Sequence, residues 1–130
     1  MSTKSIAEEY AKAWKNAIVN GDIASFEMLF ESSFVLHNKD SKDIGLATYM
    51  QHVIDLYEHS QVLNVDIKYV TSDRYLFALE FNGHYKLTSD MPGFPGTSGK
   101  EIKSDALCLY RVKNGKVIEE WSKTTVTGLA

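Results

Sequence analysis

The chain has 130 residues, of which 44% are hydrophobic and 12% aromatic, so it suits one domain with a single core and is too apolar to be disordered. Its net charge of −3 and its scattered lysines argue against a nucleic-acid partner, and no apolar run approaches the roughly 18 residues that a membrane span needs. Cys108 is the only cysteine, which excludes an intrachain disulfide and favours a reducing, cytoplasmic setting.

The N-terminal half carries helical patterns. Apolar residues at helical spacing predict an amphipathic helix over 6–19, which Asn20-Gly21 would end in a left-handed cap. Asp22 is predicted to cap a short second helix that buries Phe26 and Phe30. A short strand is expected over 34–38 and a polar loop over 39–43. Gly45 then introduces a third helix, with one face formed by Tyr49, Met50, Val53, Ile54 and Tyr57.

The C-terminal half alternates with a period of two, which is typical of strands. A first strand is predicted from Leu63, with Val65, Ile67 and Tyr69 on the same side. A long strand follows from Tyr75 to Leu87, and we interpret Gly83 as a bulge within it. A Gly/Pro-rich crossing over 93–100 leads to two final strands, joined by an Asn-Gly turn at 114–115.

Helices first and a meander of long strands afterwards predict an α+β fold. We expect a single domain over 1–130, in which a curved antiparallel sheet wraps around the N-terminal helices as a cone-shaped barrel. The open mouth of such a cone is a common ligand site. A hydrophobic small molecule is therefore the expected partner.

Four stretches of the chain resemble one known family. They run from Ala13-Trp14 to Phe26, from Val35 through His37-Asn38 to Gly45, from Gly83-His84 to Lys100, and from Asn114 to Trp121. In this order and spacing they are similar to the SnoaL-like polyketide cyclases of the nuclear transport factor 2-like superfamily, which also holds ketosteroid isomerase. The resemblance implies the cone-shaped fold, a small-molecule pocket, catalysis without a cofactor, and a homodimer formed through the outer sheet surfaces.

The chain departs from this family at one catalytic position. The family carries an acid/base Asp four residues after the tryptophan of its last strand, and here that position is Thr125. A threonine hydroxyl cannot accept a proton at neutral pH without a strong base beside it. Another residue would have to supply the acid or base.

Three residues are candidates for that chemistry. His37 lies near the place where ketosteroid isomerase-like members carry their base, and an imidazole titrates near working pH. The alternative is a histidine that is hydrogen-bonded at a strand end or that only orients a ligand. Asp105 could supply the missing carboxylate from a neighbouring strand, although a solvated position is the alternative. Lys123 could polarise a carbonyl, or it could form a surface ion pair. No residues have the spacing of a metal site.

Alternation in the last strand places Val117, Glu119, Trp121, Lys123 and Thr125 on one side, and the resemblance implies that this side faces the cavity. Trp121 would then be a flat wall for a ring system. The side chains expected to contact a ligand are Trp14, Tyr49, Tyr57, Phe77, Trp121 and Thr125.

Three functions remain open from the sequence. The first is an enzyme that acts on a hydrophobic carbonyl compound by proton transfer, as a cyclase or isomerase. The second is a non-catalytic protein that binds a hydrophobic metabolite. The third is a dimeric protein-interaction module that uses its sheet surface.

Overall fold

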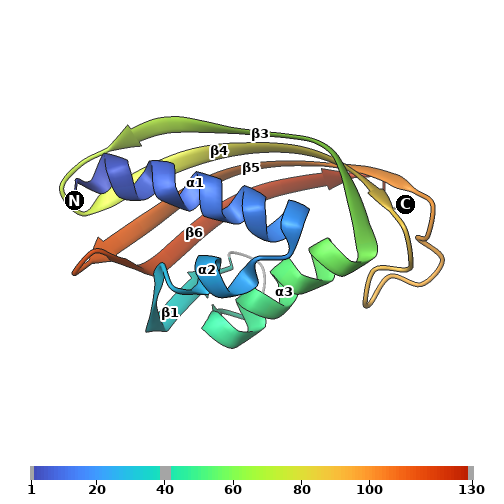
Figure 1. Cartoon of the computed structure of the whole chain (residues 1–130), viewed down its shortest axis with the longest axis horizontal. Helices are drawn as coiled ribbons and strands as arrows, with labels where there is room; N and C mark the ends of the chain where they lie inside the picture. Colours follow the sequence, from blue (N-terminus) through green and yellow to red (C-terminus); the bar gives the residue numbers. More distant parts are fainter. Residues whose placement is uncertain (1, 39–41, 129–130) are drawn as a thin grey trace.

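A curved sheet of six strands arches over three helices in the computed structural model, which describes residues 2–38 and 42–128 (Figure 1). The strand order is β2-β1-β6-β5-β4-β3, and all neighbouring strands are antiparallel except the parallel pair β1 and β6. The predicted α+β class with helices on one side of a curved, mostly antiparallel sheet is confirmed.

The helices end and begin at capped positions. Helix α1 (Thr3–Asn20) starts earlier than predicted, because the Ser2 hydroxyl accepts a hydrogen bond from the Ser5 amide as its N-cap. Gly21 ends this helix with a φ of 76°, as expected of a left-handed cap. Asp22 caps the short helix α2 (Ile23–Glu27), and Gly45 precedes α3 (Leu46–His59), both as predicted.

The first two strands depart from the sequence-based prediction. Strand β1 (Phe30–His37) begins earlier than expected, because Phe30 pairs with Val117 of β6 and does not continue the second helix. Strand β2 (Ile44–Gly45) is a short edge strand that was not predicted. The predicted polar loop over 39–43 lies in part outside the described residues.

The remaining strands are long and form one antiparallel meander, made of β3 (Ser60–Ser72), β4 (Leu76–Leu87), β5 (Glu101–Lys113) and β6 (Lys116–Thr127). The predicted turn between the last two is confirmed, since Asn114 and Gly115 both have positive φ. The long strand β4 runs unbroken through Gly83, as predicted, but it has no bulge at that glycine, so this part of the prediction is wrong. The register between β3 and β4 shifts instead on β3, between Val62 and Asn64.

Strand β6 contains a bulge that decides which of its side chains face the helices. Arg111 pairs with Glu119 while the next residue, Val112, pairs with Val117, so Ile118 is an extra residue without a partner on β5. Because side chains alternate along a strand, one extra residue moves every later side chain to the opposite face. Val117 is buried, and after the bulge Glu120 is the buried residue.

An aromatic cluster around Tyr10 fills the core between α1 and the sheet. The Tyr10 ring makes edge contacts with Phe26, Phe30 and Phe77 at centroid distances of 5.1 to 5.9 Å, and it lies 4.5 Å from Tyr110. Each such pair adds about 0.5–1.5 kcal/mol beyond the burial of its area. These contacts fix the Tyr10 hydroxyl at the inner face of the sheet.

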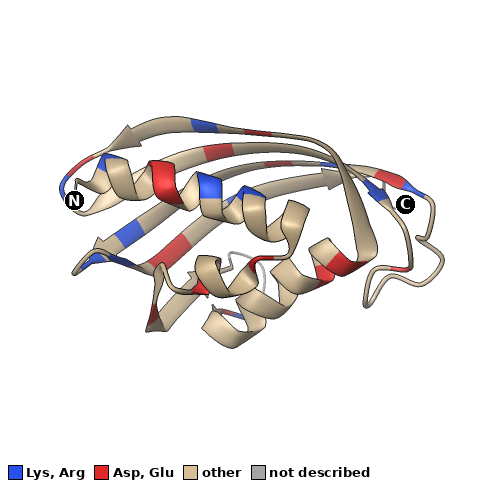
Figure 2. Cartoon of the chain, in the orientation of Figure 1, with Lys and Arg blue, Asp and Glu red and all other residues tan. Residues whose placement is uncertain are grey.

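Lys, Arg, Asp and Glu residues are interspersed over the helices and strands (Figure 2). Within the described residues, no helix is long and apolar enough to cross a membrane.

Candidate active site

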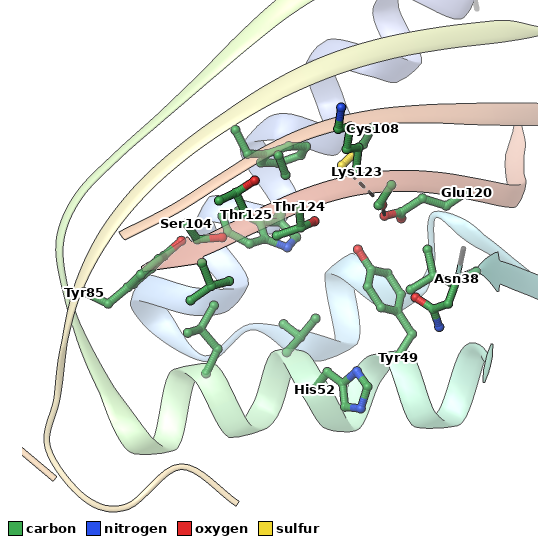
Figure 3. Close-up of a pocket in the computed structure, with 18 of the residues that line it drawn as sticks. Asn38, Tyr49, His52, Tyr85, Ser104, Cys108, Glu120, Lys123, Thr124 and Thr125 are labelled. Carbon is green, nitrogen blue, oxygen red and sulfur yellow. Dashed lines mark hydrogen bonds between the residues drawn. The ribbon is translucent and has the colours of Figure 1, made fainter. Parts of the chain in front are cut away.

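A cavity of about 810 Å³ lies between helix α3 and the inner face of the sheet. Its walls come from α1, α3, β4, β5, β6 and the crossing that precedes β5 (Figure 3). Most of the wall is apolar or aromatic, from Trp14, Val53, Leu56, Phe81, Ile102 and Ala106.

Glu120 is the only carboxyl group among the described residues that line this cavity. Its side chain is on the inner face because of the bulge at Ile118, directly across from Tyr110 on β5. The residue is only 3% exposed, which is rare for a glutamate without a cationic partner. Burial, opposed by hydrogen bonds from Ser122, Tyr49 and Tyr10, raises the pKa of Glu120 to about 7.

Three hydroxyl groups surround the Glu120 carboxylate. The Ser122 hydroxyl donates to Oε2 at 2.5 Å and the Tyr10 hydroxyl donates to Oε1 at 3.3 Å. The hydroxyls of Tyr10 and Tyr49 lie 2.9 Å apart, and Figure 3 shows Tyr49 reaching from α3 toward Glu120. Burial and the nearby Glu120 charge raise the pKa of both tyrosines well above their ordinary value, so they are proton donors at neutral pH.

The thiol of Cys108 also lines the cavity close to this group. It accepts a hydrogen bond from the Ser122 hydroxyl at 3.4 Å. Burial is the main cause that raises its pKa to about 12, so the thiol is protonated and weakly nucleophilic at neutral pH.

Three of the predicted ligand-contacting residues do line the cavity. Trp14 packs edge-on against Phe81 on the cavity wall, and Tyr49 belongs to the hydroxyl group around Glu120. Thr125 is also among the lining residues, on the last strand.

Trp121 and His37 lie on the outer face of the sheet, and this corrects the prediction that they meet the cavity. The bulge turns Trp121 of β6 outward, and its partner His37 on β1 faces away from the buried side chain of Leu36. The two rings stack there at a centroid distance of 5.1 Å. His37 Nε2 lies 2.8 Å from Glu119 and Nδ1 lies 2.9 Å from Asp43. These hydrogen bonds, that to Glu119 first, raise the pKa of His37. The imidazole therefore links β1 to β6 on the side opposite Glu120.

Three further predicted residues lie elsewhere, and a fourth, Lys123, lies at the edge of the cavity. Asp105 is exposed on β5, because its neighbours Ser104 and Ala106 take the cavity-facing positions. Tyr57 is exposed and packs against Gly21, and Phe77 is fully buried behind the wall, stacked on Tyr110 at 4.6 Å. Lys123 touches both the cavity and the outer groove, and its pairing with the exposed Leu107 puts it on the outer side.

No group of three or more potential ligand residues in the described part of the chain could hold a metal ion. The polar groups of the cavity are instead suited to hydrogen bonding and to moving a proton.

The sequence model of the SnoaL-like polyketide cyclases matches residues 6–129. The chain belongs to this family. No curated protein resembles it closely enough in sequence to count as a match.

Several solved structures share the fold at low sequence identity. A proposed polyketide cyclase from Pseudomonas putida KT2440 is 18% identical with a TM-score of 0.70, over 95% of this chain and 91% of that one. A proposed SnoaL-like polyketide cyclase from Mesorhizobium loti is 20% identical with a TM-score of 0.66, over 95% and 99%. An LEH-like epoxide hydrolase from M. tuberculosis is 12% identical with a TM-score of 0.64, over 93% and 84%. The nuclear transport factor 2-like fold is thereby shown.

Glu120, and not the position of Thr125, supplies the buried carboxyl group of this SnoaL-like chain. Plain alternation along the last strand puts Glu119 on the inner side, so the sequence alone does not indicate Glu120 as a candidate. The missing information is the bulge at Ile118, which is visible only in the pairing of β5 with β6. Two consecutive glutamates before a tryptophan were the only sequence signal, and they do not say which of the two is buried.

Proposed function

We propose that this SnoaL-like protein is a cofactor-independent isomerase or cyclase that moves protons on a hydrophobic carbonyl compound, with Glu120 as its acid/base group. The observation that carries the proposal is a single buried carboxyl group in an aromatic cavity, with a pKa of about 7. A group with this pKa is present in both protonation states at neutral pH, as a residue that takes and returns a proton must be.

In the first step, the ionised Glu120 would remove a proton from the carbon next to the substrate carbonyl. The C–H electron pair moves onto the carbonyl oxygen as an enolate, and the proton forms an O–H bond on Glu120. Either hydroxyl of the Tyr10–Tyr49 pair can act as the donor. Once Glu120 is neutral, Tyr10 can donate to Tyr49, which leaves the Tyr49 proton for the enolate oxygen.

The second step returns the proton. If Glu120 delivers it to a different carbon of the enolate, the product is an isomer. If the enolate carbon attacks a second carbonyl of the same molecule, a carbon–carbon bond forms and Glu120 protonates the resulting alkoxide, which closes a ring. Both routes use the same carboxyl group and regenerate it.

The test is deuterium exchange at carbons next to the carbonyl of neutral, hydrophobic ketones in D₂O, followed by proton NMR. This measurement detects enolate formation without knowledge of the product. We expect Glu120→Gln to slow protein-catalysed exchange by about 10²-fold or more, because the amide cannot take the proton. The matched control is Glu119→Gln, the neighbouring position on the outer face, which should leave exchange unchanged. Equal exchange by wild type and Glu120→Gln would overturn the assignment.

A second candidate is a binding protein without catalysis. It is favoured by the fact that both oxygens of Glu120 already accept hydrogen bonds, from Tyr10 and from Ser122, as in a static buried network. Binding of neutral hydrophobic compounds with no exchange by the wild-type protein would select this function.

A further inference from the structure

The cavity has a second polar region at the end opposite Glu120. Figure 3 shows Tyr85 of β4 and Glu120 of β6 at the two ends of the row of lining residues. Tyr85 is 3% exposed, and its ring lies along the strand over Gly83. A Cβ atom at Gly83 would come 2.3 Å from the Tyr85 hydroxyl oxygen, so the ring can take this position only over a glycine.

The Tyr85 hydroxyl makes no hydrogen bond to any residue in the described part of the chain, in contrast to the hydroxyls around Glu120. Burial alone raises its pKa, to about 12, with no contribution from a hydrogen bond or a charge. Among the described residues, no side-chain oxygen is both unpaired and sealed from solvent, so this hydroxyl retains access to the open cavity. The partner of this hydroxyl must therefore come from the cavity itself, as water in the free protein or as an oxygen of a bound ligand.

A second hydroxyl without a partner among the described residues lies beside Tyr85. Ser104 of β5 pairs directly with Gly83, over which the Tyr85 ring lies, and it lines the same cavity. The sheet wall between this end and Glu120 pairs Ala106 with Thr124 and Cys108 with Ser122, so it is small and uncharged. No arginine is among the described lining residues, and the lysine in the wall, Lys123, lies on the outer side of the sheet. Such an environment accepts a neutral oxygen and disfavours an anionic group.

We propose that the ligand is an elongated, uncharged, apolar compound with an oxygen function at each end, and that Tyr85 donates a hydrogen bond to the oxygen farther from Glu120. This inference rests on the proposed function for the end at Glu120 and adds the opposite end. Tyr85 is then a specificity-determining residue, with Ser104 beside it. It takes no part in the proton transfer.

The experiment is calorimetric titration with pairs of flat bicyclic, tricyclic and tetracyclic ketones. The members of each pair differ only in a second ketone at the far end. In the wild-type protein we expect the second ketone to tighten binding by about threefold to tenfold for at least one ring size, the range of a net neutral hydrogen bond. Tyr85→Phe should abolish this gain and leave the affinity for the single ketone unchanged. The exposed control Tyr75→Phe should keep the gain.

A second variant tests the same hydroxyl through its position. Gly83→Ala keeps the Tyr85 hydroxyl in the protein, but the added methyl group displaces the Tyr85 ring. This variant should therefore also remove the gain in affinity from the second ketone. The proposal is overturned if the second ketone gives no gain for any ring size, or if the gain persists in Tyr85→Phe. These affinities do not depend on turnover. If Tyr85→Phe loses the affinity gained from the second ketone and Glu120→Gln shows normal deuterium exchange, this inference holds and the role of Glu120 in catalysis is rejected. If no ketone binds, both proposals fall.

Discussion

At the scale of single residues, the decisive feature is that the carboxyl group of Glu120 lies in an apolar cavity. A carboxylate in an apolar cavity is costly, and the hydroxyls of Ser122, Tyr10 and Tyr49 offset only part of that cost. The folded protein therefore prefers the protonated form, which leaves a carboxyl group poised to lose its proton near pH 7. A solvated glutamate would already be ionised there and would be a much weaker base.

This preference predicts how stability depends on pH. The pKa of Glu120 is about 7 in the folded state, against an ordinary value of 4.5, so the folded state holds the proton more tightly. Its contribution to stability is full below pH 4.5 and is lost as the pH rises through about 7. We expect the wild-type protein to lose about 3 kcal/mol from this group over that interval. Urea unfolding at pH 5 and pH 8 measures the loss, which should be absent in Glu120→Gln. An unchanged pH dependence in that variant would contradict the buried, proton-holding carboxyl group.

At the scale of elements, the sequence anticipated the helices and most of the strands but not the details that place the site. Helical spacing, Gly21, Asp22 and the Asn-Gly turn act locally, so they could be interpreted from the chain alone. The bulge at Ile118 is a property of the pairing between β5 and β6, which depends on residues far apart in sequence. Trp14 and Tyr49 lie on helices, and they line the cavity as expected from helical spacing. Trp121 and Glu120 lie on β6 after the bulge, so the sequence alone assigns each of them to the wrong face.

His37 provides a link between elements on the outer face. Its ring bridges Glu119 on β6 and Asp43 beyond the end of β1, while Arg111 on β5 binds the other oxygen of Glu119 at 3.0 Å. The hydrogen bond to Glu119 raises the pKa of His37, and partial burial of the imidazole opposes this effect without cancelling it.

The raised pKa of His37 predicts a second pH effect in a different interval. The link stabilises the fold fully below the ordinary pKa of 6.5 and is lost as the pH rises through the raised folded value. His37→Gln should therefore be less stable than wild type at pH 6, with the difference shrinking toward pH 9, as measured by urea unfolding. His52→Gln, on the exposed part of α3, is the matched control for the loss of an imidazole. A constant difference at all pH values would contradict a charged link.

At the scale of the whole molecule, the outer face of the sheet carries exposed apolar side chains, among them Val70, Leu107 and Leu109. It carries a groove of about 630 Å³ whose walls include Val70, Ala78, Leu107, Leu109 and Trp121. Leu107 is 52% exposed although it lies in the middle of a long strand. We propose that two copies pair through this face as a homodimer, with the cavity of each copy on the opposite side of its sheet.

The proposed pairing is tested with one charge. Leu107→Lys would bury an unpaired ammonium group at the contact. We therefore expect the wild-type protein to be a dimer and the variant to be a monomer. Light scattering after size-exclusion chromatography gives the mass of each. Met28→Lys, which places the same charge on an exposed residue outside the sheet, should not change the mass. A monomeric wild-type protein would rule out the homodimer.

The division of the sheet into two faces also separates the two tryptophans of the chain. Trp14 lines the cavity, whereas Trp121 lies outside, stacked on His37 and with the Arg111 guanidinium 5.7 Å from its ring. Their intrinsic fluorescence therefore reports on different events: the emission of Trp14 responds to what fills the cavity, and that of Trp121 to the charge of the imidazole and to contacts on the outer surface. The molecule thus carries one natural optical probe for each side of its sheet.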